Sequence, residues 1–180
     1  MRFLETPFEG AFILELELIE DERGFFARSY CESEFKAHDL CSEFPQHSIS
    51  YNKSRGTLRG LHYQMPPHEE IKIVRCFRGS IFDVIVDVRP ESQTLGRCFS
   101  LELSEVNRRA LYIPKGFAHG FLSLEEETTL FYQISCDHAP KSARSIRWND
   151  PELNIPWPRM DVLVLSEKDR NAPLLKERHD

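Results

Sequence analysis

Short apolar runs separated by turn signals make up much of the chain after residue 70. In the run 81–88, apolar Phe82, Val84 and Val86 alternate with Asp83 and Asp87 and with aliphatic residues. A period of two predicts a β-strand, since successive side chains point to opposite faces. One face of this run is wholly apolar and the other is mixed, which predicts a sheet packed on one side. The predicted strands are 71–77, 81–88, 97–104, 110–114, 120–124 and 128–135.

The segments between these strands carry few helix signals. Arg78-Gly79-Ser80 predicts a hairpin between the first two strands. The clearest helix candidate is 31–40, which has an acidic first turn, and the Pro-rich segment 149–161 is expected to be irregular surface or a loop that wraps around the domain. Many short strands with little helix predict an all-β fold, and periodicity alone does not choose between a sandwich and a jelly-roll barrel.

Length and composition are those of one soluble domain, which we expect to span 1–180. A net charge of −6 argues against a general nucleic-acid binder, although it leaves room for a local basic pocket. No apolar run approaches the roughly 20 residues of a membrane span. The chain therefore predicts neither a nucleic-acid nor a membrane partner.

The cysteines and the start of the chain indicate the compartment. Five cysteines form an odd set without a C-x-x-C pair, and Cys76 and Cys98 lie inside predicted strands, so we expect buried free thiols. The segment 1–10 is interrupted by acidic residues and does not fit a signal peptide. Both features predict a cytoplasmic protein.

The stretch RGTLRGLHYQ, residues 55–64, holds the first candidate chemistry. Arg59 and His62 are three residues apart, so a regular strand would point them to opposite faces, unless a bend or bulge at Gly60 changes that relation. Taken singly, Arg59 fits a surface charge and His62 fits a hydrogen-bonded core histidine.

A second stretch carries the pattern of a cupin's second motif. Pro114, Gly116 and His119 form P-x-G-x-x-H. In metal-binding cupins this histidine joins an H-x-H pair, but here the corresponding residues are His62-Tyr63-Gln64, so one histidine is missing. The nearest later histidine, His68, follows two prolines. A three-histidine metal site is therefore poorly supported, and we expect no metal.

Other polar residues stand beside predicted strands. Lys72 shares strand parity with apolar residues, so it either snorkels at a strand end or points into a cavity. Tyr132 fits a core tyrosine, and the polar segment with Lys168 and Asp169 fits a solvated loop. Together, an arginine, a lysine and two histidines on strands of one small barrel would suit an anion such as a diphosphate.

Several of these motifs occur together in one known family. The strings at 55–69 and 113–124, with DERGFF at 21–26, Tyr132, WNDP at 148–151 and LSEKD at 165–169, closely resemble the dTDP-4-dehydrorhamnose 3,5-epimerase family. The resemblance runs over most of the chain. It implies a cupin-type jelly roll, a homodimer and a reaction without metal or other cofactor.

The resemblance also implies an activity and assigns residues to it. The substrate would be a nucleotide-diphosphate-linked 4-keto-6-deoxyhexose, dTDP-linked in the family, and the isomerase would invert carbon 3, carbon 5 or both in deoxysugar biosynthesis. His62 matches the family's base, Tyr132 its acid, Asp169 the carboxylate that orients the base, and Lys72 the cation near the enolate oxygen. Asp83 is a candidate support for His119. The matches to substrate contacts are Arg23, Phe26, Arg59, His119, Lys168 and His138.

The chain departs from the family pattern on the nucleotide side. The altered positions are Arg28, His47, Ile49, His138 and Ala143. The catalytic set is intact, so the nucleotide base, the exact sugar, the pathway and the number of carbons inverted stay open. Two alternatives also stay open: a nucleotide-sugar 3,4-ketoisomerase on a related scaffold, and a non-catalytic or metal-dependent cupin.

Overall fold

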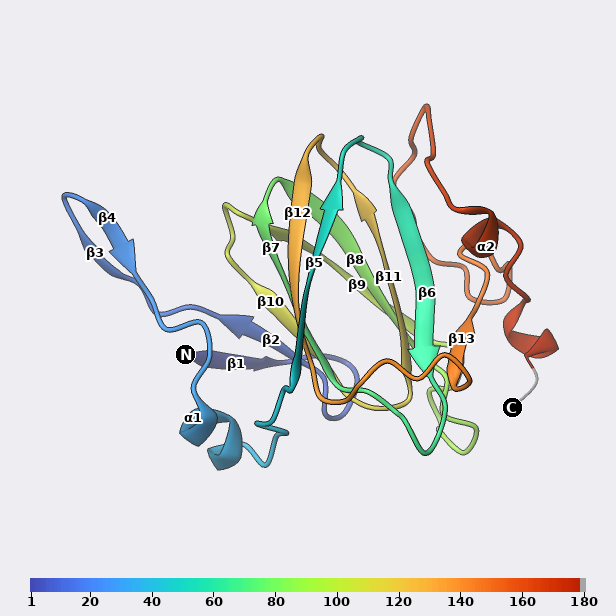
Figure 1. The fold of residues 1–180 in the computed structure, drawn as a ribbon, viewed down its shortest axis with the longest axis horizontal. Coiled ribbons are helices and arrows are strands. Elements are labelled where there is room, and N and C mark those ends of the chain that lie inside the picture. The colour runs from blue at the N-terminus through green and yellow to red at the C-terminus, as the bar shows by residue number, and fades with distance from the viewer. Residues whose placement is uncertain (179–180) are drawn as a thin grey trace.

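Two antiparallel β-sheets packed face to face form the body of the protein (Figure 1). The computed structural model describes residues 1–178. The six-stranded sheet has the order β1 (Arg2–Glu5), β2 (Phe12–Glu15), β10 (Ala110–Ile113), β7 (Lys72–Arg78), β12 (Thr128–Ile134), β5 (Gln46–Asn52). The five-stranded sheet has the order β13 (Ala143–Ser145), β6 (Leu58–Gln64), β11 (Phe117–Ser123), β8 (Ser80–Asp87), β9 (Cys98–Ser104).

The remaining elements are short. A hairpin of β3 (Ile19–Asp21) and β4 (Gly24–Phe26) projects from the body, as Figure 1 shows. The helices are α1 (Glu32–Ala37), α2 (Glu167–Arg170) and the 3-10 helix η1 (Leu175–Glu177). The predicted all-β fold with a few short helices is confirmed.

Apolar side chains fill three layers. The layer between the sheets includes Val74 and Leu130 from one sheet and Ile81 and Ile85 from the other, all fully buried. The outer face of the six-stranded sheet is covered around Phe35 of α1. The outer face of the five-stranded sheet packs against the C-terminal segment, to which the Pro-rich stretch contributes Leu153, Ile155 and Trp157. Of the two forms predicted for that stretch, irregular surface or a wrap-around loop, the structure therefore shows the loop.

The six predicted strands correspond to β7–β12, with ends shifted by up to three residues. The predicted helix 31–40 shortens to α1. The hairpin predicted at Arg78-Gly79-Ser80 is wrong. The chain does turn there, with Gly79 at φ +72°, but β7 pairs with β10 and β12 while β8 pairs with β9 and β11. The turn carries the chain from one sheet to the other.

The one-sided packing predicted for 81–88 is also wrong, because both faces of β8 are covered. Val84 and Val86, on the wholly apolar face, lie under the C-terminal segment. The mixed face, with Ile81, Asp83 and Ile85, points between the sheets. A polar group on an inner face needs a partner there, and Asp83 has one in the site described below.

A bulge in β6 sets the direction of its polar side chains. His62 pairs with His119 and Arg59 with Phe121, so two residues of β6 oppose the single residue Gly120. Gly60 has φ +124°, and a Cβ there would lie 2.5 Å from the Gly120 Cα atom. The extra residue reverses the parity of the strand, so Arg59 and His62 line the same cavity while Leu61 packs on the opposite face.

We expect Gly60→Ala to lower the free energy of unfolding by about 3 kcal/mol, because it adds steric overlap to backbone strain. The matched control is Gly24→Ala, at φ +126° with no atom within 4 Å of the added Cβ. It should cost roughly 1 kcal/mol, from strain alone. Urea unfolding of both variants measures the difference. Equal losses would mean that the close approach of Gly60 and Gly120 does not constrain β6.

Candidate functional site

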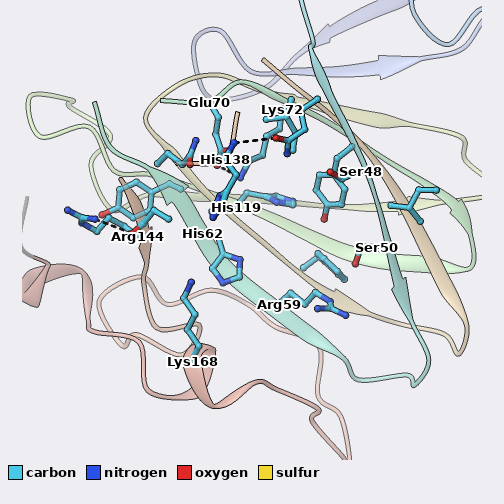
Figure 2. A pocket seen from close by; sticks show the side chains of 18 residues that line it. Ser48, Ser50, Arg59, His62, Glu70, Lys72, His119, His138, Arg144 and Lys168 are labelled. Carbon is cyan, nitrogen blue, oxygen red and sulfur yellow. Dashed lines mark hydrogen bonds and ion pairs between the residues drawn. The ribbon is translucent and has the colours of Figure 1, made fainter. Parts of the chain in front are cut away.

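A cavity of about 340 Å³ opens between the two sheets, within the size range of small-molecule sites. Its walls come from β5, β6, β7, β11 and β12, with the 135–144 segment and α2 at its rim (Figure 2). Seven of the sequence-predicted site residues line it: Arg59, His62, Lys72, His119, Tyr132, His138 and Lys168.

Asp169, the eighth, lies directly behind His62. Its Oδ1 atom is 2.6 Å from Nε2 of His62, as predicted for an orienting carboxylate. The C-terminal segment brings it there, since Val164 pairs with the start of β6 and Ser166 then caps α2 by accepting a hydrogen bond from the Asp169 backbone. The Asp169 side chain is almost fully buried, whereas that of His62 is 41% exposed.

The environment of Asp169 keeps it ionised. Burial opposes ionisation, but the hydrogen bond and charge of His62, with donors from Ser166 and the Gly60 backbone, hold the pKa of the carboxyl below its usual range. An ionised carboxylate only accepts hydrogen bonds, so Nε2 of His62 donates to it. The neutral imidazole then carries its lone pair on Nδ1.

Tyr132 enters the cavity from the other sheet. It lies on β12, and its ring is 6.0 Å from that of His119 in an edge-to-face contact. Burial raises the pKa of the Tyr132 phenol well above its ordinary value, and the negative charge of Asp83 adds to this effect. The phenol therefore stays protonated at neutral pH and is able to donate a proton.

His119 forms a second histidine–carboxylate pair. Its Nε2 atom lies 2.8 Å from Oδ1 of Asp83 on the adjacent strand β8, as the sequence predicted. Both side chains are at most 5% exposed. This pair belongs to the cavity wall, whereas the His62 ring is open toward the cavity.

Two cations of the site have fixed partners that the sequence did not predict. Lys72 pairs with Glu70 at 2.6 Å, and both side chains are largely buried. Arg59 donates from Nε to Oδ1 of Asn52 at 2.9 Å, and Asn52 is 1% exposed. The alternation of Ser48, Ser50 and Asn52 with larger residues indicates that these three share a strand face, but it does not indicate the contact of Asn52 with Arg59.

Arg23 and Phe26 are not brought to the cavity of their own chain. Both lie on the β3–β4 hairpin, which extends away from the sheets in Figure 1. The Arg23 guanidinium pairs with Asp21, and Phe26 is 71% exposed. The expectation that these two side chains join the other site residues therefore fails within one chain.

The positions that depart from the family pattern are spread out. Ile49, His138 and Ala143 line the cavity. His47 points to the other face of β5, where its ring contacts Phe131, and Arg28 lies 3.6 Å from Glu34. Ile49 shares strand parity with His47 and is 72% exposed, so its side chain lies on the outer face of β5 at the edge of the cavity. Two of the five alterations, His138 and Ala143, therefore face a ligand directly.

Within residues 1–178 no three His, Cys, Asp or Glu side chains gather as a metal-binding group, and all five cysteines are unpaired. Cys76 is buried and Cys98 is partly buried. None of the helices in this part of the chain is long and apolar enough to cross a membrane.

Comparison with known proteins gives one consistent family. Residues 5–177 match the sequence model of the dTDP-4-dehydrorhamnose 3,5-epimerase family. A protein of that name from Methanothermobacter thermautotrophicus is 43% identical, over 98% of this chain and 95% of the relative.

Solved structures agree with this match. A dTDP-6-deoxy-D-glucose-3,5-epimerase from Legionella pneumophila, in complex with dTDP-4-keto-L-rhamnose, aligns with a TM-score of 0.93 at 37% identity, covering 98% of this chain and 93% of that one. ChmJ, a 3′-monoepimerase from Streptomyces bikiniensis in complex with dTDP-quinovose, aligns with a TM-score of 0.89 at 34% identity, covering 95% and 86%. The fold is thus the cupin-type jelly roll that the resemblance implied.

The lowered pKa of Asp169 makes a prediction about acid stability. Because the folded pKa lies below the unfolded value of about 3.9, ionised Asp169 stabilises the fold above that pH, and this contribution is lost as the pH falls through the folded pKa. Asp169→Asn should therefore be less stable at pH 7 and lose less stability between about pH 4 and pH 2.5. Urea unfolding across this range measures both profiles. Parallel profiles would show that folding does not lower the pKa of Asp169.

Proposed function

The chain belongs to the dTDP-4-dehydrorhamnose 3,5-epimerase family, and we propose that its cavity epimerises a dTDP-linked 4-keto-6-deoxyhexose at carbons 3 and 5 during deoxysugar biosynthesis. The ketone at carbon 4 acidifies the protons on both neighbouring carbons. Inversion requires a base on one face of the ring and an acid on the other. The observation that carries the proposal is that His62 and Tyr132 line one cavity from opposite sheets.

His62 would be the base. Asp169 accepts a hydrogen bond from Nε2–H of His62, which leaves the Nδ1 lone pair to remove a proton from the sugar. The nearby carboxylate also stabilises the imidazolium that forms, as in other His–Asp pairs. The open side of His62 toward the cavity gives the sugar access to it.

Tyr132 would be the acid and Lys72 the stabiliser of the enolate. The protonated phenol delivers a proton to the carbon from the face opposite His62. The Lys72 ammonium, held by Glu70, can interact with the negative charge that develops on the carbon-4 oxygen. A preorganised cation of this kind contributes about 3 kcal/mol, by analogy with one oxyanion-hole donor.

The remaining cations suit the diphosphate. Arg59 and Lys168 line the cavity beside His62, and the Arg59 fork matches phosphate oxygens. His119, also in the wall, offers its imidazole as a further polar contact. The Arg59 guanidinium is held on one side, where Nε donates to Asn52 and Nη2 donates to the Tyr51 carbonyl at 3.4 Å, and its other edge, at Nη1, is proposed to bind phosphate. His138 at the rim would lie against the nucleotide.

We propose a cytoplasmic setting and a reaction that uses no metal. The five unpaired cysteines fit a reducing compartment. The proton transfers described need only His62, Tyr132 and the groups that hold them.

We also propose a homodimer in which the β3–β4 hairpin completes the cavity of the partner. The hairpin presents exposed Ile19, Phe25 and Phe26. The outer face of the six-stranded sheet presents Ile49 and Phe77, also exposed. Exposed apolar residues of this size mark association surfaces, and docking them would bring Arg23 and Phe26 to a second chain.

Incubating the protein with the dTDP-4-keto sugar in deuterated water should place deuterium at carbons 3 and 5, detected by NMR. His62→Ala should reduce exchange by at least about 10³-fold, while Tyr132→Phe should slow inversion more than exchange. A chelator should change neither the rate of deuterium exchange nor the rate of inversion of the wild-type protein. Deuterium at carbon 3 alone would indicate a monoepimerase, and a ketone moved to carbon 3 would indicate a ketoisomerase. Wild-type inversion by either variant would remove that residue from the mechanism.

Mixed dimers test the exchanged hairpin. Chains with His62→Ala and chains with Arg23→Ala plus Phe26→Ala should each be nearly inactive alone. When the two are co-expressed, half of the dimers are mixed and each carries one intact site, so activity should return to about a quarter of the wild-type value. If mass spectrometry detects mixed dimers but activity does not return, the hairpin would belong to the cavity of its own chain.

A further inference from the structure

Gln64 occupies the position at which a metal-binding cupin would carry the second histidine of its H-x-H pair. It follows His62 by two residues on β6, so both side chains line the cavity. Gln64 is 4% exposed. A buried amide needs partners for its oxygen and for its nitrogen, and the partners of Gln64 belong to a loop.

The Gln64 side chain is bound at both ends to backbone. Its Oε1 atom accepts a hydrogen bond from the Ala139 amide at 2.6 Å. Its Nε2 group donates to the His68 carbonyl at 2.9 Å and to the Asp137 carbonyl at 3.4 Å. One side chain thereby ties β6 to two stretches at the end of the barrel.

His138 stands between the two residues of the 135–142 connection that Gln64 holds. That connection links β12 to β13, and His138 is exposed at the rim of the cavity (Figure 2). The His138 amide itself donates to Oε1 of Gln46 at 3.2 Å. The backbone is therefore fixed before, at and after His138.

We propose that Gln64 is a positioning residue that sets His138 against the nucleotide, and so controls affinity for the nucleoside diphosphate rather than proton transfer. The inference rests on the proposed function, because it assigns the rim of the same cavity to the nucleotide. Two successive inward positions of β6 then have different functions. His62 acts on the sugar, and Gln64 supports nucleotide binding through the connection that carries His138.

This division predicts separate effects on binding and on turnover. Gln64→Met keeps the volume and removes the hydrogen bonds to the connection. We expect about a tenfold rise in KM and in the Kd for dTDP, from the loss of one or two net hydrogen bonds, with kcat within about twofold of wild type. Calorimetry with dTDP and steady-state kinetics measure the three quantities.

A double-mutant cycle shows whether Gln64 acts through His138. In a His138→Ala background, Gln64→Met should weaken dTDP binding by no more than about twofold. A full tenfold loss in that background would overturn the inference, and so would a fall in kcat with Kd unchanged. Gln93→Met, at an exposed position in the 88–97 loop outside the cavity, is the control for the substitution itself.

A second variant covers the case in which Gln64→Met does not fold. Gln64→Glu keeps the oxygen that accepts from the Ala139 amide, but it replaces the donor to the His68 and Asp137 carbonyls with a second carboxylate oxygen. It should therefore also raise the Kd for dTDP and leave kcat unchanged. Unchanged dTDP binding by this variant would overturn the inference. If the wild-type protein binds dTDP but does not turn over the keto sugar, the proposed function fails, and the binding measurements still test Gln64.

Discussion

The contact between the backbones of Gly60 and Gly120 determines which side chains reach the cavity. In a regular strand Arg59 would share a face with Leu61 and Tyr63, which pack under the C-terminal segment. The extra residue opposite Gly120 reverses that parity and places Arg59, His62 and Gln64 in the same cavity. Only glycine fits here, since a Cβ on either residue would lie within 2.8 Å of backbone.

Three basic side chains of the cavity are each paired with a carboxylate. His62 with Asp169, His119 with Asp83 and Lys72 with Glu70 each set a basic group against a carboxylate within 2.8 Å. Burying any of these groups alone would be costly, whereas paired groups stay ordered in the geometry a ligand needs. Such a site can bind an anion within a protein of net charge −6.

Local periodicity predicted the strands but not their neighbours. The alternation in 81–88 is visible in the sequence, yet its apolar face lies under a segment that follows more than sixty residues later, which no local window contains. The turn at Gly79 was predicted, but a turn sequence does not say whether the next strand pairs in the same sheet. Short strands such as β3 and β13 have too few residues for a period to show.

In the candidate site, too, the sequence predicted some residues, whereas others depend on tertiary contacts that it does not reveal. Motifs singled out His62 and His119 because the residues around them are distinctive, whereas the roles of Tyr132 and Asp169 followed from the family resemblance. Asn52 and Gln64 could not be found as supports, because each acts through a tertiary hydrogen bond that sequence spacing does not encode. Arg23 and Phe26 match the family pattern, but they lie on a hairpin outside the cavity of their own chain.

The positions of the altered residues explain how the chemistry and the nucleotide side can vary independently. His62, Tyr132 and Lys72 lie on β6, β12 and β7, and each of these strands is hydrogen-bonded to a neighbouring strand on both sides, so their geometry is rigid. His138 lies on a connection, and Ile49 lies on β5, which forms an edge of its sheet. Substitution at an edge or on a connection changes the surface offered to a nucleotide without moving the strands that carry the base and the acid. A catalytic set that matches its family can therefore coexist with a nucleotide rim that does not.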